Sequence, residues 1–296
     1  LAMGKGASKE RAAIERAIGP IWEANHVWLI FVFTVYFAAF PPAFAYTVTA
    51  FFSPLTVYAI GVVLRGAAFT FRHYDPEGTH RKVWTPVFAV ASVVCPFLLG
   101  AMGAAMLRKA PLGAALFDAF TILGGLFAVA LLAALAAVYL TVAASEPEVV
   151  LAFRKKALGA LVISGALALS AIVASASVAP DFTARVWGSP LWIGSALLGV
   201  IAAGLVYTRQ YRVARITTVA LVVLVVLGWG ASKGDTLVIT ESGRWTVQSA
   251  KAHEGTLRTL LASIALGALA LVPSLALLYR VFGYSKGESS ATREHP

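Results

Sequence analysis

Residues 19–31 read GPIWEANHVWLIF, a stretch in which Glu23, Asn25 and His26 lead directly into a long apolar run. An acid, an amide and an imidazole at the mouth of a membrane span are costly unless they have partners or a path to water. Glu23 and His26 can also take up and release a proton. The stretch therefore predicts a membrane protein that handles protons at a membrane surface.

The composition of the whole chain is that of a polytopic membrane protein. Hydrophobic residues make up 59% of its 296 residues, charged residues only 13%, and the mean hydropathy is +0.80, whereas soluble domains carry about 25% charged residues. Apolar blocks of about 20 residues match the helix length needed to cross a hydrocarbon core of ~30 Å. We predict an all-α, polytopic membrane helical bundle with eight transmembrane helices. They cover residues 27–47, 52–72, 86–107, 117–144, 158–179, 190–207, 213–232 and 256–281.

The positive charges divide unevenly once alternate loops are assigned to opposite sides of the membrane. One side collects 16 of the 24 Lys and Arg residues and the other collects 7, while Arg65 lies inside a span. Because an excess of Lys and Arg marks the cytoplasmic side, we expect the N-terminal region and the C-terminus to be cytoplasmic. This gives an interfacial segment over 1–26, a transmembrane bundle over 27–281 and a cytoplasmic tail over 282–296.

The net charge of +10 needs no nucleic-acid partner, because basic loops facing anionic lipid headgroups account for it. The single cysteine, Cys95, lies in an apolar span and excludes a disulfide framework. No zinc pattern, phosphate loop or nucleophile with a base at readable spacing is found, so we expect no metal site and no independent enzyme activity.

The N-terminal region predicts a surface helix. Residues 8–18 form a short amphipathic segment with Ile14 and Ile18 four positions apart, which is typical of an interfacial helix. The preceding Leu1-Ala2-Met3-Gly4 reads like the end of another span. We therefore expect one more transmembrane helix before it, which would make nine.

Three motifs, in order along nearly the whole chain, resemble a known family. They are carried by Pro20, Trp22, Glu23, Ala24, Asn25, Val27 and Trp28; by Leu64, Arg65, Gly66, Phe69, Phe71 and Arg72; and by Pro273, Leu277, Tyr279, Arg280, Val281 and Phe282. The family is subunit II of the cytochrome bd quinol oxidases, whose patterns are W-D-G-N-x-V-W, L-R-G-x-x-F-x-F-R and a closing proline followed by Y-R-V-F. This chain departs from them at Glu23, where the family has Asp, at Ala24, where it has Gly, and at Thr70, where an acid is common.

The resemblance implies a haem-free subunit in a bacterial or archaeal cytoplasmic membrane. Its partner would be subunit I, which carries haem b, haem d and the quinol site where dioxygen is reduced to water. Further partners would be quinol and dioxygen at the level of the complex, and membrane lipid. The histidines agree, because those at 26, 73, 80, 253 and 295 all lie at span ends, in loops or in the tail, where none is placed to ligate a haem in midmembrane. We expect no cofactor on this chain alone, and a bound quinone is left open as the alternative.

Within that picture Glu23 is the first candidate for proton transfer from the cytoplasm, with Asn25 and His26 as hydrogen-bonding neighbours. Partial desolvation would let the carboxyl group both accept and donate a proton. The alternatives are that Glu23 pairs with Arg65 or Arg72, or only anchors the interface. A lone histidine at a membrane interface is more often a hydrogen-bonded structural residue than a proton carrier, and we favour the structural role for His26.

Arg65 is costly because it lies about two helical turns inside its span. We favour an ion pair or hydrogen-bond hub for it, over a role in binding a quinone or tuning protons. Trp22 and Trp28 are expected to sit in the aromatic belt at the membrane boundary, and Arg72 belongs to the same structural motif as Arg65.

Two other function classes remain open from the residues alone. A secondary transporter also has many spans and a few buried ionisable groups, although no internal repeat is visible and the ionisable residues gather at one membrane face. A non-catalytic assembly or anchoring subunit is the other alternative.

Overall fold

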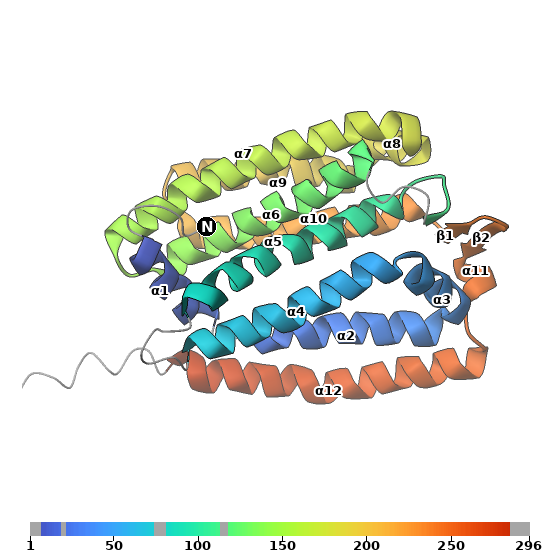
Figure 1. The fold of residues 1–296 in the computed structure, drawn as a ribbon, viewed down its shortest axis with the longest axis horizontal. Helices are drawn as coiled ribbons and strands as arrows, with labels where there is room; N and C mark the ends of the chain where they lie inside the picture. Colours follow the sequence, from blue (N-terminus) through green and yellow to red (C-terminus); the bar gives the residue numbers. More distant parts are fainter. Residues whose placement is uncertain (1–6, 19–21, 74–80, 113–117, 285–296) are drawn as a thin grey trace, which may run out of the picture.

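A computed structural model describes residues 7–18, 22–73, 81–112 and 118–284 of the chain. The side chains outside that description are those of residues 7, 8, 15, 16, 18, 22–26, 73, 81, 275 and 278–284. The described residues form a bundle of long helices with a small antiparallel hairpin at one end (Figure 1). The elements are α1 (Ala7–Ile18), α2 (Trp22–Ala39), α3 (Pro41–Ala50), α4 (Phe52–His73), α5 (Arg81–Ala105), α6 (Ala119–Ala143), α7 (Pro147–Val178), α8 (Pro180–Gly188), α9 (Pro190–Tyr207), α10 (Tyr211–Lys233), β1 (Thr236–Thr240), β2 (Gly243–Thr246), α11 (Val247–Ala250) and α12 (Glu254–Tyr284).

The all-α membrane bundle is confirmed, with one difference in the number of spans. In the described residues seven helices, α4, α5, α6, α7, α9, α10 and α12, are long and apolar enough to cross a membrane. The remaining predicted block, 27–47, is not one helix. Its apolar part in α2, Val27–Ala39, is shorter than the other spans, and α3 follows it after a break.

Proline chemistry explains the break. Phe40 leaves helical geometry with φ −136° and ψ 62°, and Pro41 then starts α3. A proline inside a helix lacks the N–H of the hydrogen-bond ladder and clashes with the preceding turn, and it also disfavours the helical conformation of the residue before it. The Pro41-Pro42 pair therefore ends α2 and becomes the first turn of α3, where the missing N–H groups cost little.

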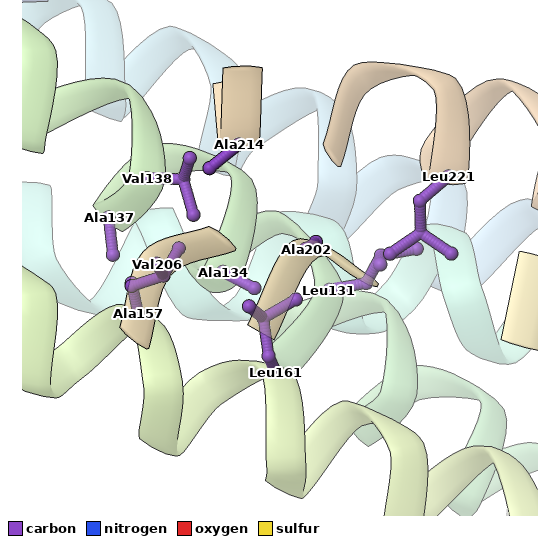
Figure 2. Packing of buried hydrophobic residues seen from close by; sticks show 10 residues of the cluster. All are labelled: Leu131, Ala134, Ala137, Val138, Ala157, Leu161, Ala202, Val206, Ala214 and Leu221. Atoms are coloured by element: carbon purple, nitrogen blue, oxygen red, sulfur yellow. The ribbon is translucent and has the colours of Figure 1, made fainter. Parts of the chain in front are cut away.

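The centre of the bundle is built from small and branched side chains on four helices. Figure 2 shows these side chains converging between α6, α7, α9 and α10. Small residues let membrane helices approach closely and gain dispersion contacts. The residues of this cluster are Leu131, Ala134, Ala137, Val138, Ala157, Leu161, Ala202, Val206, Ala214 and Leu221.

The helices α5 and α6 approach each other very closely at two glycines of α6. A Cβ placed on Gly124 would lie 2.5 Å from the Cβ of Ala104, and one on Gly125 would lie 2.6 Å from the ring of Phe97. Both distances are shorter than any real carbon contact, so the two helices can adopt this spacing only with glycine at these positions.

The helix ends gather at two opposite ends of the bundle (Figure 1). At one end α1 packs against the turn between α6 and α7, with Ala13 of α1 buried beside Leu140 and Phe153. At the other end the β1–β2 hairpin is anchored by Lys233, whose Nζ donates to the carbonyl oxygens of Met106 and Leu237 at 2.9 and 2.5 Å. This hairpin was not predicted, because the sequence indicated only a loop between 233 and 255.

The α1 helix is attached by ion pairs as well as by apolar contacts. Lys156 Nζ donates to Glu10 Oε2 at 2.5 Å, with both side chains largely buried. Lys9 lies 3.0 Å from Glu146, which raises the pKa of Lys9 above its usual value and keeps it charged. The helix predicted over 8–18 is therefore present, and its polar face is held against the bundle.

Candidate functional site

The candidate site is a polar seam between α4 and α5. On α4, Tyr58, Arg65 and Arg72 repeat every seven residues, and on α5, Phe88, Ser92 and Cys95 follow an i, i+4, i+7 spacing. Each spacing places its residues on one face of a helix. The two faces meet, because α4 and α5 pack side by side along the bundle (Figure 1).

Arg65 lies at the centre of this seam. Its Nε donates a hydrogen bond of 3.2 Å to Ser92 Oγ, and its guanidinium carbon lies 5.5 Å from the ring centre of Phe88. A hydroxyl acceptor and an aromatic face both stabilise a guanidinium inside an apolar span, through a hydrogen bond and through the ring quadrupole. The described contacts of Arg65 are this hydrogen bond and this ring contact; the choice between a hydrogen-bond hub and a role at a quinone stays a prediction.

Arg72 shares the same aromatic ring from two turns further along α4. Its guanidinium carbon lies 5.4 Å from the centre of Phe88, and the residue is buried. Beside it, Phe71 stacks on Trp84 of α5 with ring centres 4.8 Å apart. The last two turns of α4 are thus fixed to the first turns of α5, and two positive charges are held on one face at this end of the bundle.

Below Arg65 the seam continues with a thiol and a backbone carbonyl. Cys95 is buried, and its Sγ donates a weak hydrogen bond of 3.8 Å to the carbonyl oxygen of Tyr58. A Cβ on Gly61 would lie only 2.7 Å from that sulfur, so the thiol fills the space of the missing side chain. Ser92, Phe88 and Tyr58 were not predicted as part of a site, although the seven-residue spacing around Arg65 could have identified them.

The seam can hold negative charge but cannot exchange protons efficiently by itself. Guanidinium groups stay protonated in proteins and act only as donors. Serine and tyrosine hydroxyls pass protons only within a chain of better acids and bases. A proton path along this seam would therefore need a carboxyl group from outside it.

The residues predicted for proton transfer begin the neighbouring helix. Glu23, Asn25 and His26 belong to the first turns of α2, but their side chains, like that of Trp22, lie outside the described residues. The start of α2 and the end of α4 lie at the same end of the bundle (Figure 1). The predicted pairing of Glu23 with Arg65 or Arg72 stays a prediction. Trp28 is half exposed and meets Phe31 edge to face with ring centres 6.2 Å apart, which is compatible with the predicted aromatic belt.

In the described part of the chain, no group of three His, Cys, Asp or Glu side chains is arranged so that it could hold a metal ion. Of the five histidines, His253 has a described side chain, and its Nδ1 accepts a hydrogen bond from the N–H of Gly255 at 3.2 Å. That contact begins α12 and leaves no reason to assign His253 to a haem.

Two large apolar surfaces accompany the seam. No described residue of Glu254–Ser274 in α12 is buried within this chain, and α12 contacts α2 along its length. On α2 itself Val27, Ile30 and Val32 are each more than half exposed. Surfaces of this kind in a membrane protein meet lipid or another chain.

The chain was compared with families of known sequence and with solved structures. A family described as cytochrome bd terminal oxidase subunit II matches residues 1–282. Cytochrome bd ubiquinol oxidase subunit 2 of Bacillus subtilis (strain 168) is 32% identical over 125 residues, which cover 39% of this chain and 37% of the relative. Cytochrome bd-I ubiquinol oxidase subunit 2 of Escherichia coli (strain K12) is 28% identical over 102 residues, or 34% of this chain and 27% of the relative.

A solved structure has the same fold. A chain in the structure of bd oxidase from Geobacillus thermodenitrificans superposes with a TM-score of 0.75 at 22% sequence identity, covering 91% of this chain and 84% of that one. The matched segments of the two curated relatives are each well under half of the relatives' length. The family match, in contrast, extends over almost the whole chain.

Proposed function

The chain belongs to the cytochrome bd terminal oxidase subunit II family, and from this premise we propose that it is the haem-free subunit of a membrane quinol:oxygen oxidoreductase. The observation that carries the proposal is the match of the family over residues 1–282, together with the fold shared with a bd oxidase chain. The chain would act as part of the complex and not as an enzyme alone.

The chemistry of electron transfer is assigned to a partner, subunit I, that holds haem b and haem d. Axial haem ligands are His, Met, Cys or Tyr side chains placed inside a bundle. By sequence position, the five histidines fall outside the middle of the predicted spans. The exposed apolar lengths of α2 and α12 support the same proposal, because a second multi-span subunit would cover them.

Proton supply is the contribution we propose for this chain. Reduction of dioxygen to water consumes protons, and a carboxyl group at a helix mouth can collect them from water. Glu23 opens α2 at the end of the bundle where the Arg65–Arg72 seam ends. Asn25 and His26, within one turn of Glu23, are the proposed neighbours.

The distribution of positive charge supports a proposal for which end of the bundle faces the cytoplasm. The turns that carry Lys9, Lys156 and Arg154 lie at the α1 end, whereas Lys233 and Arg185 lie at the hairpin end. By sequence, 16 Lys and Arg residues fall on the side of the α1 end and 7 on the side of the hairpin, which supports placing the α1 end, and with it the C-terminal tail, in the cytoplasm of a bacterial or archaeal cell.

The decisive experiment is to purify the tagged chain from its native membranes in mild detergent and record a reduced-minus-oxidised optical spectrum with quinol-driven oxygen uptake. Haem b and haem d bands, a stoichiometric larger subunit and oxygen uptake are expected. A colourless preparation of the chain alone, without uptake, would overturn the proposal and favour a transporter. Haem bands from a larger subunit without uptake would favour an assembly or anchoring role.

A further inference from the structure

We propose that the turn between α9 and α10 is a binding site for the phosphodiester headgroup of an anionic phospholipid, with Arg209 and Arg212 as the groups that hold it. This inference is independent of the proposed oxidase function. It rests on the backbone of the turn, on the charges around it and on the exposed face of α10 beneath it.

The turn has an arginine where glycine is ordinarily required. The N–H of Gln210 donates to the carbonyl of Leu205 at 2.9 Å and that of Arg209 donates to Val206 at 3.3 Å, which is the hydrogen-bond pattern of a Schellman cap. Arg209 takes the left-handed position of this cap, with φ 64°, and is the one non-glycine residue with positive φ in the described chain. A side chain there costs about 1 kcal/mol relative to glycine.

The preference for Lys and Arg in cytoplasmic loops does not explain why an arginine occupies this strained backbone position. An arginine at position 208 or 210 would contribute the same charge to the same loop without occupying the strained position. Residues held in sparsely populated backbone conformations are found where a side chain must point in one direction. The conformation therefore indicates that the direction of the Arg209 side chain matters.

Positive charge at this turn is not neutralised by the protein. The turn and the start of α10 carry Arg209, Arg212 and Arg215, and the segment 190–234 contains no Asp or Glu. Arg154 of α7 lies against the same turn and donates to the carbonyl oxygens of Val206 and Tyr207 at 3.2 and 2.8 Å. Arg209 and Arg212 are exposed and form no ion pair with any carboxylate in the described residues.

Two cations at the opposite end of the bundle do have carboxylate partners. There Arg108 pairs with Asp118 at 3.1 Å and Lys109 pairs with Asp181 at 2.9 Å. The α9–α10 turn thus keeps its charge available for a partner of opposite sign from outside the chain.

The face of α10 below the turn identifies that partner as a lipid. Starting at Arg212, exposed side chains recur at helical spacing through Ile216, Val219, Val223 and Val226, each 47–69% exposed. At 1.5 Å per residue the apolar part of this strip, from Ile216 to Val226, is ~15 Å long, which matches the ~15 Å of one hydrocarbon leaflet. An anionic phospholipid fits both features, because its phosphate can bind the two arginines and its acyl chain can lie along the apolar strip. Free phosphate could bind the arginines but would make no contact with the strip.

Guanidinium groups suit this ligand because two parallel N–H donors can bind two phosphate oxygens at once. Tyr207, itself well exposed, lies under the guanidinium of Arg154 with 5.5 Å between that carbon and the ring centre. It supplies an amphipathic ring at the level of the headgroup, where tyrosines of membrane proteins gather.

The test uses the complex purified from its native membranes and placed in nanodiscs of phosphatidylcholine with or without phosphatidylglycerol. The variant Arg209→Gly with Arg212→Gln removes both cations and relieves the backbone strain at the same time, so folding is preserved. The matched control is Arg244→Gln with Lys251→Gln, which removes two exposed cations from the hairpin end. Native mass spectrometry measures the phosphatidylglycerol retained, and thermal unfolding in pure phosphatidylcholine measures folding.

The original chain and the control are expected to retain phosphatidylglycerol equally. The Arg209→Gly, Arg212→Gln variant should lose affinity by about 30-fold at low salt, because each cation near an anionic surface contributes about a factor of five. Its unfolding temperature in phosphatidylcholine should be unchanged or higher. Equal retention by all three proteins would overturn the proposal.

Two further arms separate the lipid from other occupants. Photoreactive phosphatidylglycerol should cross-link to the peptide covering 207–216, and cross-links that occur only on a partner polypeptide covering this turn would overturn the proposal. Millimolar inorganic phosphate in phosphatidylcholine discs should not stabilise the complex. Stabilisation by inorganic phosphate equal to that by phosphatidylglycerol would show a free-anion site and overturn the assignment to lipid.

Discussion

Arg65 of α4 and Ser92 of α5 are joined inside the membrane-spanning part of the bundle by a 3.2 Å hydrogen bond from guanidinium Nε to the hydroxyl oxygen. The bond gives the buried guanidinium group a polar partner and joins two neighbouring helices. It also fixes the register of α4 against α5, and with it the position of Arg72 at the end of the seam.

If Arg65 is a hub, Ser92→Ala should lower stability without lowering turnover. Loss of the hydroxyl leaves the guanidinium one hydrogen bond short, at a cost of about 1–3 kcal/mol. The measurement is the thermal unfolding temperature of the complex beside quinol-driven oxygen uptake. Ser170→Ala is the control, because that exposed hydroxyl bonds only to Ala166 of its own helix. A large rise in KM for quinol with an unchanged unfolding temperature would instead assign Arg65 to a bound quinone.

Glu23→Gln should slow oxygen uptake by about 100-fold, the order of magnitude that a positioned proton-transfer group contributes. Glu23→Asp keeps the carboxyl group and should retain most of the activity. The control is Glu241→Gln in the exposed hairpin turn. Each protein is compared at equal haem content. Full uptake by Glu23→Gln would mean that Glu23 only pairs or anchors.

Glu10→Gln should loosen α1 from the bundle. The substitution leaves the ammonium group of Lys156, which is mostly buried, without its carboxylate partner, and partly buried pairs broken in this way lose about 1–3 kcal/mol. We expect faster proteolytic cleavage within residues 7–18. Glu148→Gln is the control, since Glu148 is exposed and 3.7 Å from Lys9. The exchange Glu10→Lys with Lys156→Glu should restore part of the protection, and no difference between Glu10→Gln and the control would refute the role of the pair.

Gly124→Ala should destabilise the contact between α5 and α6. The new methyl group would lie 2.5 Å from Ala104 Cβ and 3.2 Å from the carbonyl oxygen of Gly100, and overpacking of this kind costs about 1–3 kcal/mol. Gly165→Ala in α7 has nothing within 4 Å and is the matched control. Thermal unfolding of the two variants in the same detergent gives the comparison. Equal unfolding temperatures would mean that α5 and α6 separate readily.

Much of the architecture could be read from short stretches of chain. The apolar blocks predicted seven of the spans because helix length and membrane thickness are matched, and the predicted span 190–207 has the same bounds as α9. The 27–47 block was wrong as a single helix, although Pro41-Pro42 was visible in it. The hairpin was missed because β1 and β2 are short, and what fixes them is the distant Lys233 contact with Met106.

The sequence by itself determined that the chain crosses a membrane repeatedly, which apolar blocks form most of its spans, and that Glu23, Arg65 and Arg72 are unusual residues for their positions. These are local properties, since hydropathy, capping and helical period depend on residues close together in the chain. Only the tertiary structure decided that Arg65 donates a hydrogen bond to Ser92 and that the guanidinium groups of Arg65 and Arg72 both lie near the ring of Phe88. It also decided that Arg154 donates a hydrogen bond to a carbonyl oxygen at the end of α9. Such pairings join residues 16 to 53 positions apart, and they depend on the packing of whole helices, which no local pattern of hydrophobicity or charge specifies.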